Sequence, residues 1–452
     1  MIEIKGKHCR DLKIFTDNVD EEALVSLHRI ADLVQFDGKK IRIMPDVHQG
    51  KGNAVIGFSC PVDIEKDSVN PEYVGCDIGC SISAVFYTKP IPGDKIAEFE
   101  RRIGRTIPFG FNINDEKKVD PQTIMETFNS HLRKLISSYP LFSEYVPMFK
   151  QEKDLEKWCR KIGVDYDVFL RSIGSVGGGN HFLEYDENNE LQKYAVVVHC
   201  GSRNLGLKVF GYWNKLAKST TVSKDELEEI INIVKSKNKD RRELEVEIKA
   251  AKEEYRECMK GKVTGFLSGS NLLNYLVDVC IAQAYAELNH KVIHSQIDEI
   301  YLEMSDGGKR CDEIYTTHNY IDYDFKVLSG RHNMMLRKGA IRAYSGERCI
   351  IPFNMRDGIS ICEGRSNEEW NYTAPHGCGR LYSRRKAKEL LNVDDFKKEM
   401  RDANIYTTTA DKNTLDEAPS AYKPKNEIVR LIDPTVKILF FMNPKMNIKS
   451  GE

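Results

Sequence analysis

The 452-residue sequence has no apolar run near the roughly 20 residues that a membrane-spanning helix needs. Residues 1–5 mix charged and apolar side chains and lack the apolar stretch of a signal peptide. We therefore expect no membrane association and a cytoplasmic location. The 12 cysteines include no Cys-x-x-Cys pair, which excludes zinc ribbons and thioredoxin-type redox sites. Structural disulfides are not expected in a reducing compartment.

An excess of charge of one sign is also missing, because 67 Lys and Arg balance 68 Asp and Glu. Affinity for a nucleic acid would therefore have to come from a local basic patch rather than from the overall field. Hydrophobic residues make up 41% and charged residues 30%, and no internal repeat is present. This composition is that of a globular protein, and it excludes disorder and collagen-like structure.

The common nucleotide-binding loops are absent as well. Residues 174–180 are rich in glycine, but no Gly-Lys-Ser/Thr follows them, which excludes a Walker A loop. The glycine spacing of a Rossmann fold is missing too. No Lys-x-Asp-Gly segment of the kind found in lysine-adenylating ligases occurs.

The hydrophobic patterns predict a mixed α/β fold. Residues 194–198 are a continuous β-branched run, typical of a strand buried on both faces, and this strand ends in His199. Such strand ends are where α/β folds place reactive side chains. The patterns predict helices over 17–35 (capped by Asp17 or Asn18), 271–293 and 390–400, and strands over 40–44, 55–58, 81–87, 194–198 and 436–442.

Residues 223–262 differ from the rest of the chain, because they are dense in Lys and Glu and poor in apolar side chains. They are predicted to form a helical hairpin that turns near residues 236–240 and is inserted into a single domain spanning residues 1–452. Two roles stay open for the hairpin: a solvated surface excursion, or an arm that contacts RNA or a partner.

Several residues with metal-binding chemistry stand in glycine-rich loops or at strand ends. Asp77 and Cys80 are separated by two residues, and His181, His199 and His318 lie elsewhere in the chain. One thiolate, one carboxylate and three imidazoles form a set too soft for Mg²⁺ or Ca²⁺ but suited to Mn²⁺, Zn²⁺ or Fe²⁺. Five ligands exceed one tetrahedral site, which favours two metal ions bridged by the thiolate. The alternative for Cys80 is a small buried hydrophobic residue.

A further histidine, His376, stands between proline and glycine on a turn followed by Arg380, Arg384 and Arg385. Guanidinium groups bind phosphate oxygens in a bidentate manner. A neutral imidazole nitrogen can attack an α-phosphate to form a phosphoramidate. The alternative is that His376 only donates a hydrogen bond within a phosphate-binding turn. His48, in residues 44–52, is another loop histidine in an unusual setting.

These motifs together resemble the RtcB family of GTP-dependent RNA ligases. Seven separate motifs occur in the family's order, from about residue 40 to the C-terminus. They are residues 44–52, 75–80, 177–184, 199–203, 318–320, 337–340 and 376–380.

The resemblance implies a single large α/β domain of the family's own type, with a central cleft for nucleotide and metal. It implies an enzyme that uses GTP and two Mn²⁺ ions to join an RNA 2′,3′-cyclic phosphate or 3′-phosphate end to a 5′-hydroxyl end. The reaction would pass through a covalent histidine–GMP intermediate at His376 and serve RNA repair or tRNA splicing. We expect a monomer. Whether an activator of the archease type is required stays open.

The resemblance also assigns roles to single residues. Asp77 and His181 would hold one ion, His199 and His318 the other, and Cys80 would bridge them. Asp46 resembles an acidic residue near the incoming 5′-hydroxyl. In the nucleotide site, Asn180 would contact the α-phosphate, Glu184 the guanine edge, Tyr422 the stacked base and Lys449 guanine O6, joined by Asn354, Cys378, Gly379 and Arg380. The candidates for holding RNA phosphates are Arg203, Arg337, Lys338 and Arg384.

Two departures from the family pattern indicate a divergent member. Residues 352–358 replace the usual Pro-Gly-Ser-Met-Gly beside the nucleotide, and Cys378 replaces an alanine. Two other functions therefore stay open. One is a metal-dependent phosphodiesterase or phosphatase acting on RNA ends, with weakened guanylylation. The other is a non-catalytic protein that binds RNA or a partner.

Overall fold

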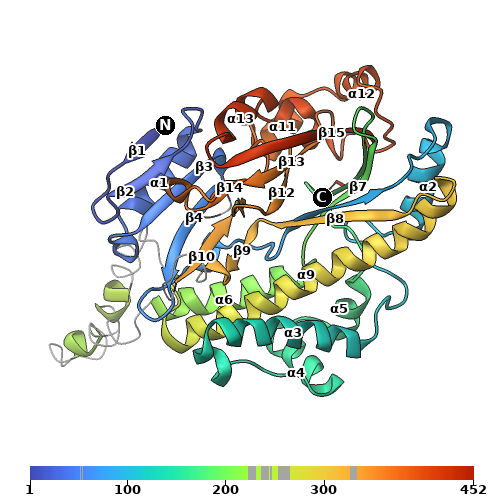
Figure 1. Cartoon of the computed structure of the whole chain (residues 1–452). Coiled ribbons are helices and arrows are strands. Elements are labelled where there is room, and N and C mark those ends of the chain that lie inside the picture. Colours follow the sequence, from blue (N-terminus) through green and yellow to red (C-terminus); the bar gives the residue numbers. More distant parts are fainter. Residues whose placement is uncertain are drawn as a thin grey trace.

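The structure is a computed structural model that describes residues 1–50, 52, 54–221, 231–235, 244, 247–252, 265–325 and 333–451. Its described parts form a mixed α/β fold in which sheets lie above a layer of helices (Figure 1). No helix among the described residues combines the length and apolar character needed to cross a bilayer.

The strands form sheets in which segments far apart in the sequence are neighbours. Most pairs are antiparallel, and β2 and β3 are parallel. One sheet has the order β1 (Ile2–Ile4), β2 (Asp11–Ile14), β3 (Lys40–Gln49), β4 (Val55–Asp63), β10 (Asn333–Lys338) and β9 (Asn319–Asp322). Another has the order β12 (Arg348–Pro352), β13 (Ile359–Gly364), β15 (Val436–Lys449), β6 (Phe182–Asn188), β7 (Lys193–Cys200), β5 (Ser81–Tyr87) and β8 (Arg310–Thr317); β11 (Ala340–Arg342) pairs with β14 (Thr373–Pro375).

The helices gather mainly below and above the sheets. Those below are α3 (Pro121–Ser138), α4 (Glu152–Ile162), α5 (Tyr166–Ser172), α6 (Asn204–Thr221) and α9 (Gly269–Met304), and those above are α11 (Arg384–Leu390), α12 (Val393–Asp402) and α13 (Lys425–Ile432) (Figure 1). The others are α1 (Glu21–Ala31) and α2 (Ile96–Thr106). Short 3₁₀ turns span Val34–Phe36, Pro71–Tyr73, Gly93–Lys95, Pro140–Glu144, Glu368–Trp370, Leu415–Glu417 and Pro419–Ala421.

Helix α9 is the central support of the fold. Its first half, including Tyr275 and Ile281, packs into one hydrophobic core with α3 and α6. Its second half, including Ile297 and Tyr301, packs into another core beneath β5, β6 and β7. A helix that is apolar on most faces is stable only when buried, and α9 is buried along most of its length.

Between these two apolar halves, α9 carries buried polar residues that bind neighbouring loops. Asn289 Oδ1 accepts hydrogen bonds from the backbone N–H groups of Gly174 (2.7 Å) and Ser175 (3.3 Å). Its Nδ2 donates to the carbonyls of Ser175 and Gly201, both at 3.2 Å. His290 Nε2 donates to the Cys200 carbonyl at 3.0 Å. One turn of α9 therefore joins the loop before His181 to the strand end after His199.

Most predicted elements are present, with shifted ends. The strand over residues 81–87 is confirmed at both ends. The first helix starts at Glu21, because the Asp20 carboxylate accepts the Ala23 N–H at 2.7 Å; the predicted caps Asp17 and Asn18 are wrong. Strand β3 continues five residues beyond Met44, and its register with β4 shifts between Ile43 and His48.

The predicted strand near the C-terminus is shorter than the observed one. The final strand was expected to end at residue 442, but β15 runs on to Lys449 and pairs with β6. Lys449 therefore lies on an inner strand rather than on a free tail. Helix α9 likewise continues past residue 293, because apolar residues resume at helical spacing after residues 294–296.

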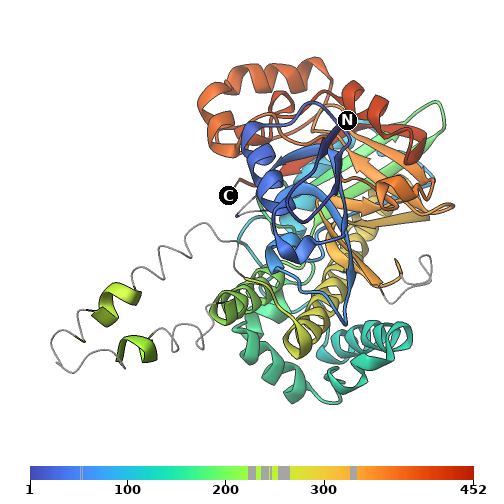
Figure 2. The same cartoon turned by 90° about the vertical axis from the view of Figure 1, so that its left-hand side faces the viewer.

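The hairpin predicted over residues 223–262 lies largely outside the described residues. Within it, residues 231–235 and 247–252 are described, and both segments are helical. Figure 2 shows short helical segments to one side of the main body. The hairpin stays a prediction.

Replacing Asn289 with alanine tests the role of the polar turn of α9. The change leaves buried backbone groups of Gly174, Ser175 and Gly201 without their partner, at about 1–3 kcal/mol for each unsatisfied group. We expect a lower melting temperature in thermal unfolding. Asn274→Ala on the same helix removes only a bond to the Ser270 carbonyl in an exposed setting and is the matched control. Equal destabilisation by the two variants would contradict this role.

Candidate active site

The thiolate, carboxylate and imidazoles predicted to bind metal come together from separate elements. Cys80 Sγ lies 3.3 Å from His181 Nε2 and 3.2 Å from His199 Nε2. Asp77 Oδ2 lies 2.8 Å from His181 Nε2, and His318 Nε2 lies 3.3 Å from His199 Nε2. The ligand atoms form two groups, Asp77–Cys80–His181 and Cys80–His199–His318, which share the sulfur. This geometry fits two metal ions with a common thiolate ligand.

Electrostatics prepare part of this cluster for metal binding. Burial, followed by the neighbouring imidazoles, lowers the pKa of His199 and of His318 well below its usual range. Both rings are therefore neutral, the form that coordinates metal. Burial also disfavours the charged form of His181, but the Asp77 carboxylate outweighs it and raises the pKa of His181 to about 9. Metal binding at this position has to displace a proton.

Backbone contacts orient the ligands. His199 Nδ1 lies 3.0 Å from the Asn180 carbonyl oxygen and donates to it, so the lone pair is on Nε2, facing Cys80. Glycine is required on both sides of the cluster. A Cβ atom on Gly177 would lie 2.1 Å from His181 Nδ1, and one on Gly201 would lie 2.4 Å from Asp77 Oδ1. Both positions admit only a residue without a side chain.

His376 lies next to this cluster, with its ring centroid 4.9 Å from that of His318. The Asp46 carboxylate holds it: Oδ2 is 2.6 Å from His376 Nδ1 and 3.1 Å from its backbone nitrogen. Nδ1 therefore carries the proton, and the lone pair is on Nε2. The ring remains partly exposed, whereas Asp46 is fully buried.

The shifted register of β3 aims Asp46 at His376. Bulged registers re-aim side chains near functional sites. His48 Nδ1 donates to the Asp46 carbonyl at 2.9 Å, and Lys423 Nζ donates to the carbonyls of Pro45 and Val47, both at 3.1 Å. The structure thus places Asp46 against His376, and the expected position of Asp46 near the incoming 5′-hydroxyl stays a prediction.

The predicted nucleotide residues Arg380, Tyr422 and Lys449 meet at a buried acid that sequence analysis missed. Glu417 Oε1 pairs with Arg380 Nη1 at 2.9 Å, and Oε2 with Lys449 Nζ at 3.2 Å. The Tyr422 hydroxyl also donates to Oε2. Burial alone would raise the pKa of Glu417, but Lys449 and Arg380 lower it to about 2. No sequence pattern separates Glu417 from surface acids.

Three other residues predicted to bind the nucleotide, Asn180, Glu184 and Asn354, make different contacts within the protein. Asn180 joins the groups described above, since its carbonyl also accepts Lys449 Nζ at 3.3 Å. Glu184 is buried and accepts a bond from Asn447 Nδ2 at 2.7 Å; burial raises its pKa to about 8. Asn354 is engaged within its own loop, where its Nδ2 donates to Asp357 at 2.8 Å.

Residues 378 and 379, in the turn after His376, pack closely against neighbouring parts of the fold. The side chain of Cys378 is buried in a hydrophobic cluster with Ile341 and Ile428, so any contact with a nucleotide would have to come from its backbone, and the expected contact stays a prediction. Gly379 has a φ of +73°, and a Cβ there would lie 2.2 Å from the Asp46 carbonyl oxygen. Glycine at 379 therefore lets the turn approach β3 closely.

The four basic residues expected to bind RNA differ in how exposed their side chains are. Arg337 has a fully buried guanidinium that pairs with Asp322, which speaks against the expected RNA contact, and that contact stays a prediction. Lys338 is buried, donates to the Glu72 carbonyl at 2.8 Å, and has its pKa lowered to about 8 by burial. Arg203 and Arg384 remain partly exposed near the glycine-rich loop.

Arg203 and Arg384 both contact this loop. Arg203 Nε donates to Ser175 Oγ at 3.0 Å. Arg384 Nη2 lies 3.5 Å from Asn180 Oδ1. Of the four basic residues, these two combine partial exposure with a contact to this loop.

A buried thiol, carboxylate and imidazole cluster beside an oriented histidine defines a candidate metalloenzyme centre. The family model described as tRNA-splicing ligase RtcB matches residues 27–450, and the chain belongs to this family.

Relatives match over most of their length. The RNA-splicing ligase RtcB of Escherichia coli (strain K12) is 25% identical, with 97% of each chain covered. The tRNA-splicing ligases RtcB of Nanoarchaeum equitans and Thermococcus kodakarensis are 24% and 23% identical. The match to the Nanoarchaeum equitans protein covers 93% of this chain and 89% of the relative. The match to the Thermococcus kodakarensis protein covers 90% of this chain and 87% of the relative.

Replacing Cys80 with alanine tests the shared thiolate. Because its sulfur belongs to both groups of ligand atoms, we expect the variant to lose most of its bound Mn²⁺ after loading and dialysis, measured by elemental analysis. Cys60→Ala removes another buried thiol, one in a hydrophobic core, and should keep its metal. Retention of both ions by the Cys80 variant would disprove the bridge.

Replacing Glu417 with glutamine tests the buried acid. The folded pKa of about 2 lies below the ordinary 4.5, so ionised Glu417 stabilises the fold above pH 4.5, and this contribution is lost as pH falls towards 2. We expect the variant to be less stable by on the order of 1–3 kcal/mol near neutral pH, with a smaller loss at acid pH. Thermal unfolding between pH 3 and 7 measures both effects. Glu313→Gln, which removes an exposed ion pair with Arg310, should change neither the stability near neutral pH nor its dependence on pH.

Proposed function

We propose that this chain is a GTP- and Mn²⁺-dependent RNA ligase. It joins 2′,3′-cyclic phosphate or 3′-phosphate ends to 5′-hydroxyl ends through GMP carried on His376. Membership of the RtcB family supports RNA ligation. The observation that carries the histidine step is the 2.6 Å contact between His376 Nδ1 and Asp46 Oδ2, next to the donor cluster.

This contact supports His376 as the nucleophile. With the proton held on Nδ1 by Asp46, the lone pair of Nε2 is available for attack. In the proposed step, a bond forms between Nε2 and the α-phosphorus of GTP. The bond from that phosphorus to the bridging oxygen breaks, and pyrophosphate leaves with the electron pair. Asp46 stabilises the positive charge that develops on the ring.

Asp77, Cys80, His181, His199 and His318 would hold the Mn²⁺ ions. Bound there, the ions would supply Lewis-acid stabilisation of negative charge on phosphate oxygens. The chain's own cations would add to this effect. Arg203 and Arg384, which contact the loop that carries Asn180, would bind phosphate there, and the pair of Lys449 with Glu417 would orient the ammonium group.

The later steps transfer GMP to the RNA. Water first opens a cyclic phosphate by breaking its 2′-O–P bond, which leaves a 3′-phosphate and a 2′-hydroxyl. An oxygen of the 3′-phosphate then forms a bond to the phosphorus of GMP as the N–P bond to His376 breaks. Finally the 5′-hydroxyl oxygen forms a bond to the RNA phosphorus, its proton passes to solvent, the anhydride bond breaks, and GMP leaves with the electron pair. Tyr422 and Glu184 are proposed to contact the guanine, which remains on the enzyme through these steps.

Replacing His376 with alanine tests the nucleophile. Incubation with α-labelled GTP and Mn²⁺ should label the parent protein with GMP in an acid-labile, base-stable bond, as expected of a phosphoramidate. We expect the variant to form no adduct, because it lacks the attacking nitrogen, while its metal content stays unchanged. His131→Ala, at an ion pair with Glu287 that includes none of the candidate ligands, should be labelled like the parent.

Two outcomes would count against the proposal. A surviving adduct in the His376 variant would place the nucleophile elsewhere. A parent protein that releases phosphate from RNA ends without ever carrying GMP would instead indicate a metal-dependent phosphodiesterase or phosphatase.

A further inference from the structure

Phe111 is exposed to an unusual degree at the edge of the candidate active site. Its exposed fraction is 90%, whereas the other aromatic side chains among the exposed large hydrophobic residues of the described chain are 37–39% exposed. Those are tyrosines, whose hydroxyl groups suit a wet surface. Single exposed apolar residues are common, so exposure alone carries no argument. The argument comes from how Phe111 is held and where.

Hydrogen bonds hold the loop backbone before and after Phe111. Arg203 Nη2 donates to the Gly110 carbonyl at 2.7 Å and to the Asn112 carbonyl at 3.3 Å. Further along, the buried Asn114 donates from Nδ2 to the Ile173 carbonyl at 2.8 Å. These bonds fix the backbone on either side of Phe111. The ring is therefore displayed at a set place rather than carried on a loosely attached loop.

The same loop packs against residues of the proposed reaction centre. A Cβ atom on Gly178 would lie 3.5 Å from Gly110 Cα, and Gly178 stands three residues before His181. A Cβ on Gly110 would lie 2.6 Å from Ser450 Oγ, which follows Lys449. Phe111 thus stands where the glycine-rich loop meets the end of β15.

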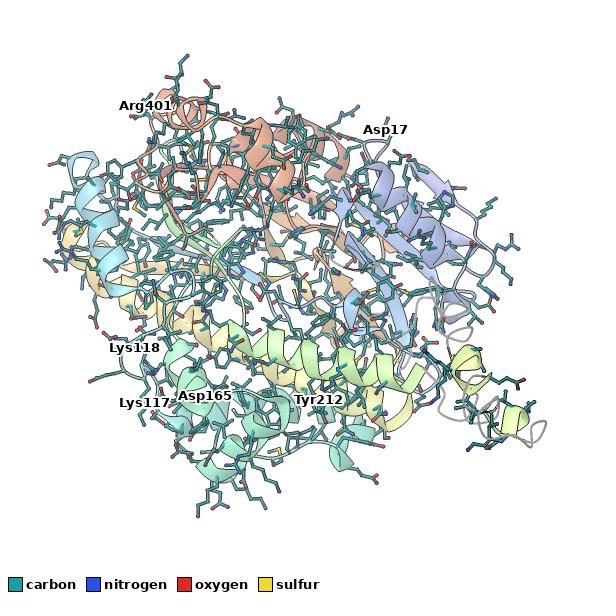
Figure 3. All side chains as sticks on the ribbon, turned by 180° about the vertical axis from the view of Figure 1, so that it is seen from behind. Asp17, Lys117, Lys118, Asp165, Tyr212 and Arg401 are labelled. Atoms are coloured by element: carbon teal, nitrogen blue, oxygen red, sulfur yellow. The ribbon has the colours of Figure 1, made fainter. Side chains whose placement is uncertain are left out.

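Positive charge lies on the same loop. Lys117 and Lys118 are exposed and stand side by side at the surface (Figure 3). A Cβ on Gly174 would lie 3.5 Å from Lys118 Cγ, which places this lysine beside the glycine-rich loop. Asp115 and Glu116, also exposed, balance the charge of the two lysines. A general attraction for polyanions therefore does not explain the exposure of Phe111 on this loop.

An exposed aromatic face beside phosphate-binding side chains is how proteins bind single-stranded nucleic acid. Unpaired bases stack on such rings, and stacking tolerates any sequence because every base has a π-face. We propose that Phe111 is a stacking platform for an unpaired base of the RNA end being joined, and that Arg203 holds the platform in place. This inference rests on the proposed function, since it takes the RNA end as the substrate.

The test measures RNA binding separately from guanylylation. The probes are two single-stranded RNAs with a terminal 2-aminopurine, one at a 3′-phosphate end and one at a 5′-hydroxyl end. Stacking quenches the fluorescence of this base, and anisotropy gives the Kd. The variants are Phe111→Ala, Phe111→Leu and Phe111→Tyr, with Leu191→Ala as control. Leu191 is 50% exposed at the β6–β7 turn, away from His199 at the other end of β7.

We expect Phe111→Ala to weaken binding of one probe by about 5- to 100-fold and to abolish its quenching. The end that responds identifies the strand that stacks. Phe111→Tyr should restore both signals, because it keeps an aromatic face, whereas Phe111→Leu should not restore quenching. The dependence of Kd on salt should not change, since no charge is removed. Labelling with GMP in the absence of RNA should match that of the parent.

Three results would overturn the platform. One is an unchanged Kd and quenching for both probes in Phe111→Ala. Another is equal quenching by Phe111→Leu, which would indicate a general apolar contact, such as a protein-binding surface. The third is loss of GMP labelling in Phe111→Ala, which would show that the residue shapes the site instead. A parent that binds RNA with Phe111-dependent quenching but never takes up GMP would refute the proposed function and leave the platform standing.

Discussion

The buried polar turn of α9 is the contact on which the active-site geometry depends. Asn289 and His290 lie between two apolar cores and bind backbone groups of the loops that carry His181 and His199. Loops that meet at a catalytic centre have many backbone polar groups and few apolar side chains, so they cannot be held by hydrophobic packing alone. A helix satisfies its own backbone, which leaves its side chains free to bind the loops.

The same helix supports the other ligand-bearing segments through close packing. A Cβ on Gly79, beside Cys80, would lie 3.1 Å from Ala286 Cβ, so the turn that presents Asp77 and Cys80 rests directly on α9. Gln283 accepts a bond from the Ile321 N–H at 3.4 Å, three residues after His318. Four segments distant in sequence therefore share one rigid support, which explains how the five candidate ligands converge.

Charge in the site is arranged in matched pairs. Asp46 holds His376, Asp77 holds His181, and Glu417 holds both Arg380 and Lys449. Removing one partner would leave the other buried and uncompensated, which costs several kcal/mol, so these contacts hold the functional groups in fixed orientations. The positions of Arg380 and Lys449, both proposed to contact the nucleotide, thus depend on the buried acid Glu417. Such an acid cannot be recognised by its chemistry alone.

By itself the sequence determined the chemistry and the family. The loops around Asp77, Cys80 and the histidines carry their residue types in a fixed order. The continuous β-branched run over residues 194–198 predicted β7, which is buried over most of its length. Local patterns of this kind depend on neighbours in the chain. They therefore remain readable without the fold.

The tertiary structure alone decided which polar residues work together. Arg337 and Arg203 look alike in sequence, yet one is paired with Asp322 in the interior and the other supports the Phe111 loop. Glu417, Asn289 and Asp46 acquire their roles from partners far away in the sequence, such as Lys449 for Glu417 (32 residues) and His376 for Asp46 (330 residues). Burial and pairing at such separations are properties of the packed chain. No local pattern encodes them.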